Sequence, residues 1–141
     1  MNFSVGDIPF FKEYLFTDTG KTARHFGLIL LPSEATQFKN SILCCVITSK
    51  KPTQWSFMLV KKNYAFFDRD SFACFNGKDL VPLSGVDKEP QPRGKLTQSD
   101  FKEVFKILKK SLFVIKDIAN DPFLRGTIIY EWKRVFNKKS Q

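Results

Sequence analysis

The sequence predicts a mainly β fold with helices at its C-terminal end, in the α+β class. Short apolar segments separated by turn signals fill the first part of the chain, and the apolar period becomes helical after Thr97. The chain has 141 residues, of which 43% are hydrophobic and sixteen are Phe. This is enough to enclose a core within one domain. We expect residues 1–116 to form the β part with its first helix, and residues 117–141 to add a helical tail.

The strand signals are clearest before residue 50. The segment Ile8–Leu15 is apolar and aromatic, and Pro9 suggests a strand start or a sheet edge there. A polar, Gly-containing loop is expected at 17–22. The segments Phe26–Leu31 and Ile42–Ser49 are almost continuously apolar, which is typical of strands covered on both faces.

Shorter strand signals follow. Trp55–Val60 alternates in character, and Asn76-Gly77 predicts a tight hairpin turn into a strand at Asp79–Leu83. Several Pro and Gly residues make Ser84–Gly94 a loop. Many short strands separated by turns predict a small barrel or a sandwich.

Two helices are expected after the strands. Thr97 and Asp100 have the spacing of a capping box, so the first helix should run over 98–116. Asp121-Pro122 suits the start of a second helix. The apolar stripes that predict these helices are Phe101, Val104, Phe105, Leu108, Leu112 and Ile115, followed by Leu124, Ile128, Trp132 and Val135.

Charge and composition limit the function classes. The net charge of +9 and a pI near 9.6 favour an anionic partner, most commonly nucleic acid. No apolar run approaches the roughly 18 residues of a membrane span, and the N-terminus does not resemble a signal peptide. We expect a cytoplasmic protein without a membrane role. The three cysteines are expected to be core residues in a reducing compartment. With one His and no ligand-spaced cluster, no metal or cofactor is expected.

Five short motifs occur in order along the chain, namely Gly6-Asp7, Arg24-His25, Ile47-Thr48-Ser49, Arg69-Asp70-Ser71 and Lys95-Leu96-Thr97. Their order and spacing resemble those of the MazF/PemK family of toxin endoribonucleases. The resemblance covers residues 5–115, and His25 stands where the family usually has Pro. It implies a small SH3-like β-barrel, a homodimer, a cognate antitoxin partner and metal-independent cleavage of single-stranded RNA.

The chemistry of such cleavage requires particular kinds of side chain. The ribose 2′-hydroxyl attacks phosphorus, the phosphoryl oxygens gain charge, and the leaving 5′-oxygen needs a proton. Arg24 carries a permanent, planar cation suited to phosphoryl oxygens. Thr48 carries a hydroxyl that can donate to the same group, and the resemblance assigns catalysis to both positions. His25 is the remaining candidate, as the acid or the base. Adjacent strand residues face opposite ways, so Arg24 and His25 share a mouth only if the chain bends.

Four further residues are candidates for RNA binding. Lys50, Lys51 and Arg69 can contact phosphates, and Ser49 follows the candidate Thr48 directly. Nearby aromatic residues, such as Tyr64, suit base stacking. Asp70 either orients Arg24 or caps a turn.

Two other functions remain open at this stage. A basic barrel that binds nucleic acid or protein without catalysis would explain the charge equally well. A gyrase poison of the CcdB type would share the fold class but not the pairing of Arg24 with Thr48.

Overall fold

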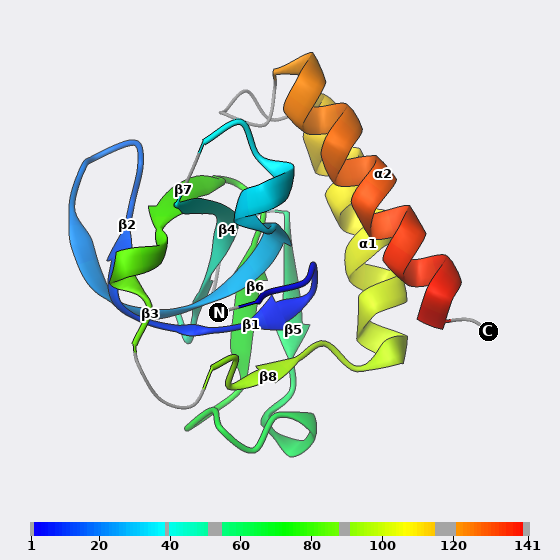
Figure 1. Cartoon of the computed structure of the whole chain (residues 1–141). Coiled ribbons are helices and arrows are strands. Elements are labelled where there is room, and N and C mark those ends of the chain that lie inside the picture. The colour runs from blue at the N-terminus through cyan, green and yellow to red at the C-terminus, as the bar shows by residue number, and fades with distance from the viewer. Residues whose placement is uncertain (1, 39, 51–54, 88–90, 115–120, 140–141) are drawn as a thin grey trace.

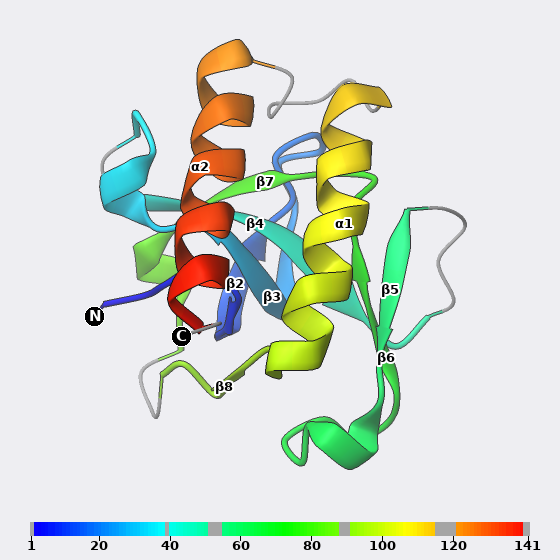
Figure 2. The same ribbon diagram turned by 90° about the vertical axis from the view of Figure 1, so that its right-hand side faces the viewer.

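The computed structural model describes residues 2–38, 40–50, 55–87, 91–114 and 121–139. A layer of antiparallel strands is covered on one side by two helices (Figures 1 and 2). The strands are β1 (Asp7–Ile8), β2 (Phe10–Leu15), β3 (Thr22–Leu31), β4 (Ser41–Thr48), β5 (Ser56–Leu59), β6 (Ser71–Cys74), β7 (Asp79–Pro82) and β8 (Gly94–Lys95). The helices are α1 (Gln98–Val114) and α2 (Pro122–Lys139), and the single 3-10 turns are Ser33–Ala35, Lys61–Asn63 and Leu83–Gly85.

The main sheet has the strand order β2-β3-β4-β6-β5, and β7 also pairs with β4. β1 and β8 form a separate two-stranded ribbon. The predicted class, mainly β with C-terminal helices, is confirmed. Among the described strands no pairing joins β2 to β5, so closure into an SH3-like barrel stays a prediction.

The predicted hairpin at Asn76-Gly77 is wrong. β7 pairs with Ser41–Cys44 of β4, while β6 pairs with the far end of the same strand at Ile47 and Thr48. Two successive strands therefore share one edge of β4. A type I′ turn needs positive φ at both central residues, and neither Asn76 nor Gly77 has it. The buried Lys78 ammonium instead donates to the Phe75 carbonyl, at 2.7 Å, across the corner between the strands.

β3 begins four residues earlier than its apolar run predicted. Leu15 pairs with Thr22 and Tyr14 with Ala23, so backbone pairing with β2 extends β3 through its polar entry. The first residues of β3 are polar because they are more exposed than the rest of the strand, and not because the strand has ended. This extension is what places Arg24 and His25 on a strand.

The core consists of two clusters on opposite faces of the sheet. The larger cluster lies between the sheet and the helices, and it includes Leu28, Cys45 and Trp132. The smaller cluster lies on the other face, and it includes Phe11 and Tyr14 of β2 and Val81 of β7. Along most of β3 and β4, alternation sends successive side chains to one cluster or the other. Leu30 and Leu31 both lie in the larger cluster, at the point where the pairing of β3 with β4 shifts register.

α1 begins where the capping residues predicted. The Thr97 hydroxyl accepts the Asp100 N–H at 3.1 Å. The Asp100 carboxylate does not accept the Thr97 N–H directly, as it would in a capping box, because the Tyr64 hydroxyl lies between them. The hydroxyl accepts the Thr97 N–H at 3.2 Å and donates to the Asp100 carboxylate at 2.6 Å. Burial and the bond to Asp100 raise the pKa of Tyr64 to about 12.

α2 also begins where predicted, and it packs on α1 and β3. Asp121 accepts the Phe123 N–H at 2.8 Å as a cap. The Trp132 indole stacks on Phe101 with centroids 4.6 Å apart and donates to the Leu30 carbonyl at 2.9 Å. The tail helix lies beside α1 over the sheet (Figure 2), and its buried side chains belong to the same core as those of the β part.

The three cysteines are free, and burial raises the pKa of Cys44 and Cys45. Within the described residues, neither helix combines the length and apolar character that crossing a bilayer requires.

Candidate functional site

A pocket of about 390 Å³ opens where β3 begins and β4 ends, beside the segment that enters β6. Most of its polar wall consists of residues from three of the sequence motifs. The lining residues are Phe10, Arg24, His25, Phe26, Ile47, Thr48, Ser49, Lys50, Phe67, Asp68, Arg69 and Ser71.

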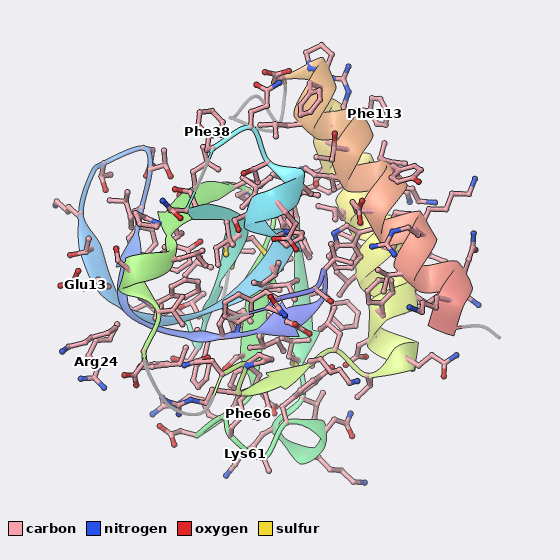
Figure 3. All side chains as sticks on the ribbon, in the orientation of Figure 1. Glu13, Arg24, Phe38, Lys61, Phe66 and Phe113 are labelled. Carbon is pink, nitrogen blue, oxygen red and sulfur yellow. The ribbon has the colours of Figure 1, made fainter. Side chains whose placement is uncertain are left out.

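Arg24 is exposed, and its guanidinium lies over the Phe10 ring at 5.4 Å from the centroid. Phe10 is in turn paired with Phe26 across β2 and β3. The aromatic surface supports the flat cation by a cation–π contact and leaves its N–H groups for another acceptor. Figure 3 shows Arg24 projecting from the β part away from the helices.

His25 lies on the other face of β3. Its ring packs edge-on against Phe16, with centroids 5.6 Å apart, and Nδ1 lies 3.4 Å from the Ile47 carbonyl. With the proton on Nδ1, the ring donates to that carbonyl and leaves Nε2 as an acceptor. His25 lines the pocket, but its ring lies against the smaller core cluster.

Thr48 is half-buried at the end of β4. Phe26 pairs with Ile47, and continuing this register places Thr48 opposite His25. Alternation therefore directs Arg24 and Thr48 to opposite faces of the sheet. Both still line one pocket, because it lies at the strand ends, where residues of both faces border it.

Ser49 and Lys50 extend the pocket beyond β4 and are both exposed. The Thr48 hydroxyl oxygen accepts the Lys50 N–H at 3.2 Å, which turns the chain at this point. Within the part of the chain that the structure describes, the Thr48 O–H hydrogen has no acceptor, so it can be donated to a ligand. Lys51 lies outside the described residues.

The motif at 69–71 forms the opposite wall. Arg69 is exposed and Ser71 is buried, and the Ser71 hydroxyl donates to the Arg69 carbonyl at 3.1 Å. The Asp70 carboxylate accepts the Lys61 N–H at 2.7 Å. Of the two roles expected for Asp70, orienting Arg24 or capping a turn, this bond is the cap. Arg24, Lys50 and Arg69 outnumber Asp68 in the pocket, so its charge is positive.

The floor was missed at the sequence level. It is aromatic, with Phe26 contacting Phe10 at 4.9 Å and Phe67 at 5.0 Å between centroids. Tyr64, which suggested base stacking, is buried and bound to α1. The two-residue spacing of Ile8 and Phe10 on a predicted strand places both side chains on one face. The pairing of Phe10 with Phe26 depends on how the strands meet in the folded protein, which the local sequence does not indicate.

Phe10 is held from its outer side as well. The Gln91 side chain accepts the Phe10 N–H and donates to the Phe10 carbonyl, both at 3.1 Å. A second guanidinium, from Arg93, lies 5.3 Å from the ring centroid and bonds Asp87 at 3.0 Å. Phe10, whose ring supports Arg24, is therefore held by two hydrogen bonds at its backbone and contacts two guanidinium groups.

No family model and no curated protein matches this chain. Among solved structures, the Mycobacterium tuberculosis toxin MazF-mt6 aligns with a TM-score of 0.52 at 13% identity, covering 77% of this chain and 98% of that chain. The chain has a MazF-like fold. This fold agrees with the family resemblance of the five motifs. In this chain β3, β4 and β6 are successive neighbours in the sheet, and residues of all three line the pocket.

Proposed function

We propose that this protein is an endoribonuclease toxin that cleaves single-stranded RNA without a metal ion. The observation that carries the proposal is the pocket itself, in which Arg24, Thr48, Lys50 and Arg69 surround an aromatic floor. The MazF-like fold, shared with a neighbour that is a toxin, supports the same function.

In this proposal the RNA backbone crosses the ends of β3 and β4. Arg24 binds two phosphoryl oxygens and stabilises their growing charge while the 2′-hydroxyl attacks phosphorus. Thr48 donates its hydroxyl hydrogen to a phosphoryl oxygen from the other side. The products are a 2′,3′-cyclic phosphate and a 5′-hydroxyl, whose oxygen takes its proton from solvent water as it leaves.

His25 is proposed as the proton-transfer group. The bond from Nδ1 to the Ile47 carbonyl leaves Nε2 to accept the 2′ proton. Contact with RNA requires substrate to reach the edge of the imidazole beside Phe16. Lys50, Lys51, Arg69 and Ser49 are proposed to bind the phosphates and sugars of the flanking nucleotides.

A homodimer and a cognate antitoxin that covers the pocket are part of the proposal, and both rest on the family resemblance. An exposed, positively charged pocket is a surface that such a partner would have to neutralise.

The test is cleavage of a mixed RNA pool in the presence of a chelator, with mapping of the fragment ends. We expect cyclic phosphate and 5′-hydroxyl ends, and no cleavage where a 2′-deoxy nucleotide replaces the attacking ribose. Arg24→Ala should lower the cleavage rate by about 100-fold or more, since one charge-stabilising group is removed. Arg134→Ala, on the exposed side of α2, is the matched control.

The opposite faces of Arg24 and Thr48 favour one alternative, a pocket that binds RNA without cutting it. RNA that is bound and never cleaved would establish that alternative in place of the nuclease. Trapping of gyrase on DNA would establish a CcdB-type poison.

A further inference from the structure

A second pocket, far from the first, lies in a groove between the two helices. α1 and α2 run antiparallel and side by side (Figures 1 and 2). The groove between them encloses about 340 Å³. Its lining residues are Lys102, Phe105, Lys106, Lys109, Ile129, Lys133, Phe136 and Asn137. None of them lines the pocket at β3 and β4.

The floor of this groove is apolar. Phe105 is nearly buried, and its ring centroid lies 6.3 Å from that of Phe136. Ile129 of α2 is partly buried and completes the floor. A groove of this kind accepts aliphatic side chains by removing apolar surface from water.

The rim of the groove is cationic. Lys102, Lys106 and Lys109 follow one another at helical spacing along α1, and Lys133 faces them from α2. All four are exposed. The Lys109 ammonium lies 4.6 Å from the Phe105 ring centroid, and Lys106 contacts Glu103 at 3.5 Å. The lysines outnumber that single carboxylate, so the rim attracts negative charge.

The same surface continues beyond the pocket. Phe113 lies one helical turn after Lys109, and Arg125 lies one turn before Ile129. Phe113 is 66% exposed, and the Arg125 guanidinium lies 5.2 Å from its ring centroid. An exposed aromatic ring beside a cation thus repeats the chemistry of the groove at its far end. Figure 3 shows Phe113 beside the helices and Arg24 on the other side of the molecule.

We propose that this groove docks an acidic amphipathic helix of a partner protein. Apolar side chains at positions i, i+3 or i+4, and i+7 of that helix enter between α1 and α2. Its flanking carboxylates meet the lysine rim, which sets orientation and excludes neutral or basic helices. The groove has an apolar floor between cationic edges. An acidic amphipathic helix has the complementary arrangement, with an apolar stripe between carboxylates.

RNA fits this groove less well than it fits the first pocket. Base stacking needs an open ring face, and Lys109 covers the face of Phe105. Ile129 offers no ring, and Phe136 is partly buried against the core. The proposal is independent of RNA cleavage, because the two surfaces share no residue.

Fluorescence anisotropy with the full chain tests the proposal. The probe is a labelled peptide of about 18 residues, roughly five helical turns, with Leu at helical spacing and Glu elsewhere. A scrambled peptide of the same composition keeps the charge and removes the stripe. The variant Lys109→Glu with Lys133→Glu reverses the charge of two of the four rim lysines. Lys12→Glu with Lys110→Glu makes the same charge change outside the pocket lining.

We expect the patterned peptide to bind and the rim variant to weaken binding by about tenfold or more, while the control variant binds nearly as the parent does. Phe113→Ala should also weaken binding without unfolding the protein, because the ring is largely exposed. Circular dichroism checks that each variant is folded. Equal binding of the scrambled peptide, no binding at all, or displacement of the peptide by an RNA oligonucleotide with the same dependence on the rim would each overturn the proposal.

Discussion

At the residue scale, the Tyr64 hydroxyl replaces half of a capping box. It connects the Thr97 N–H to the Asp100 carboxylate, and so ties the turn before β6 to the first turn of α1. The sequence predicted the cap because Thr97 and Asp100 have the right spacing. It could not predict the tyrosine, which comes from a segment more than thirty residues earlier.

Tyr64→Phe should therefore lower the free energy of unfolding by about 1–2 kcal/mol, since the mutation removes two bonds from partly buried partners. The pKa of Tyr64 is raised from its ordinary value of 10.0 to about 12. The bond thus stabilises the fold fully below pH 10, and this contribution disappears as the pH rises from 10 towards 12. Urea unfolding at several pH values measures the difference between the parent and the variant. A difference that stays constant up to pH 12 would contradict the assignment.

The polar residues of the candidate site could be predicted from the sequence, but the directions of their side chains and the aromatic floor could not. Arg24, Thr48, Lys50 and Arg69 belong to short motifs that are visible in the sequence, and they line one pocket. Their directions were not visible, because the register of β3 against β4 decides which face each side chain takes. The aromatic floor depends on contacts between β2, β3 and the segment before β6, which no local pattern reports.

At the scale of elements, α2 shows how tertiary packing overrides local propensity. Its start at Pro122 and its apolar stripe were predicted, although Gly126 and the β-branched residues after it oppose a helix. Burial of Leu124, Ile128 and Trp132 supplies the stabilisation that the local sequence lacks. The Asn76-Gly77 hairpin failed for the same reason, because β4 offers its edge to both flanking strands.

Gly126→Ala should stabilise the protein by about 0.5–1 kcal/mol. The position is exposed, a Cβ there meets nothing within 4 Å, and alanine loses less backbone entropy in a helix. Thermal unfolding followed by circular dichroism measures the shift. Gly27→Ala is the contrasting variant, because its Cβ would lie 2.7 Å from the Phe11 ring, and it should be destabilising by about 1–3 kcal/mol.

Removal of residues 119–141 tests whether the tail helix is part of the core. The truncation removes Trp132 from Phe101 and leaves the Leu30 carbonyl without its indole donor. We expect loss of cooperative unfolding or aggregation, measured by calorimetry and size-exclusion chromatography. A truncated chain that stays soluble and unfolds like the parent would show that α2 is dispensable.

At the scale of the whole molecule, two separate groups of cations contribute to the net charge of +9. Arg24, Lys50 and Arg69 gather at the strand ends, and four lysines gather between the helices. The composition predicted an anionic partner, but it could not show that the cations form separate groups. The chain order hides this, because residues 24, 50 and 69 meet only after the sheet forms.

RNA affinity should therefore fall with salt, and its dependence should trace to the first group alone. Replacing Lys50 and Arg69 with Gln should reduce the slope of log affinity against log salt by about 0.7 for each phosphate that is no longer neutralised. Lys106→Gln with Lys133→Gln, in the helix groove, should leave the slope unchanged. Filter binding with a single-stranded RNA over a range of salt concentrations makes the comparison. Equal slopes for both double variants would contradict the assignment of RNA to the strand ends.

The two hydrogen bonds from the Gln91 side chain to the Phe10 backbone bear on self-association. By bonding both backbone groups of Phe10, this amide occupies positions on the outer margin of β2 that an incoming strand would need. Among the described strands, β5 pairs with β6 alone and ends the sheet at the opposite side, with Met58 exposed. Should two copies ever join by extending this sheet, the seam would form along Ser56–Leu59.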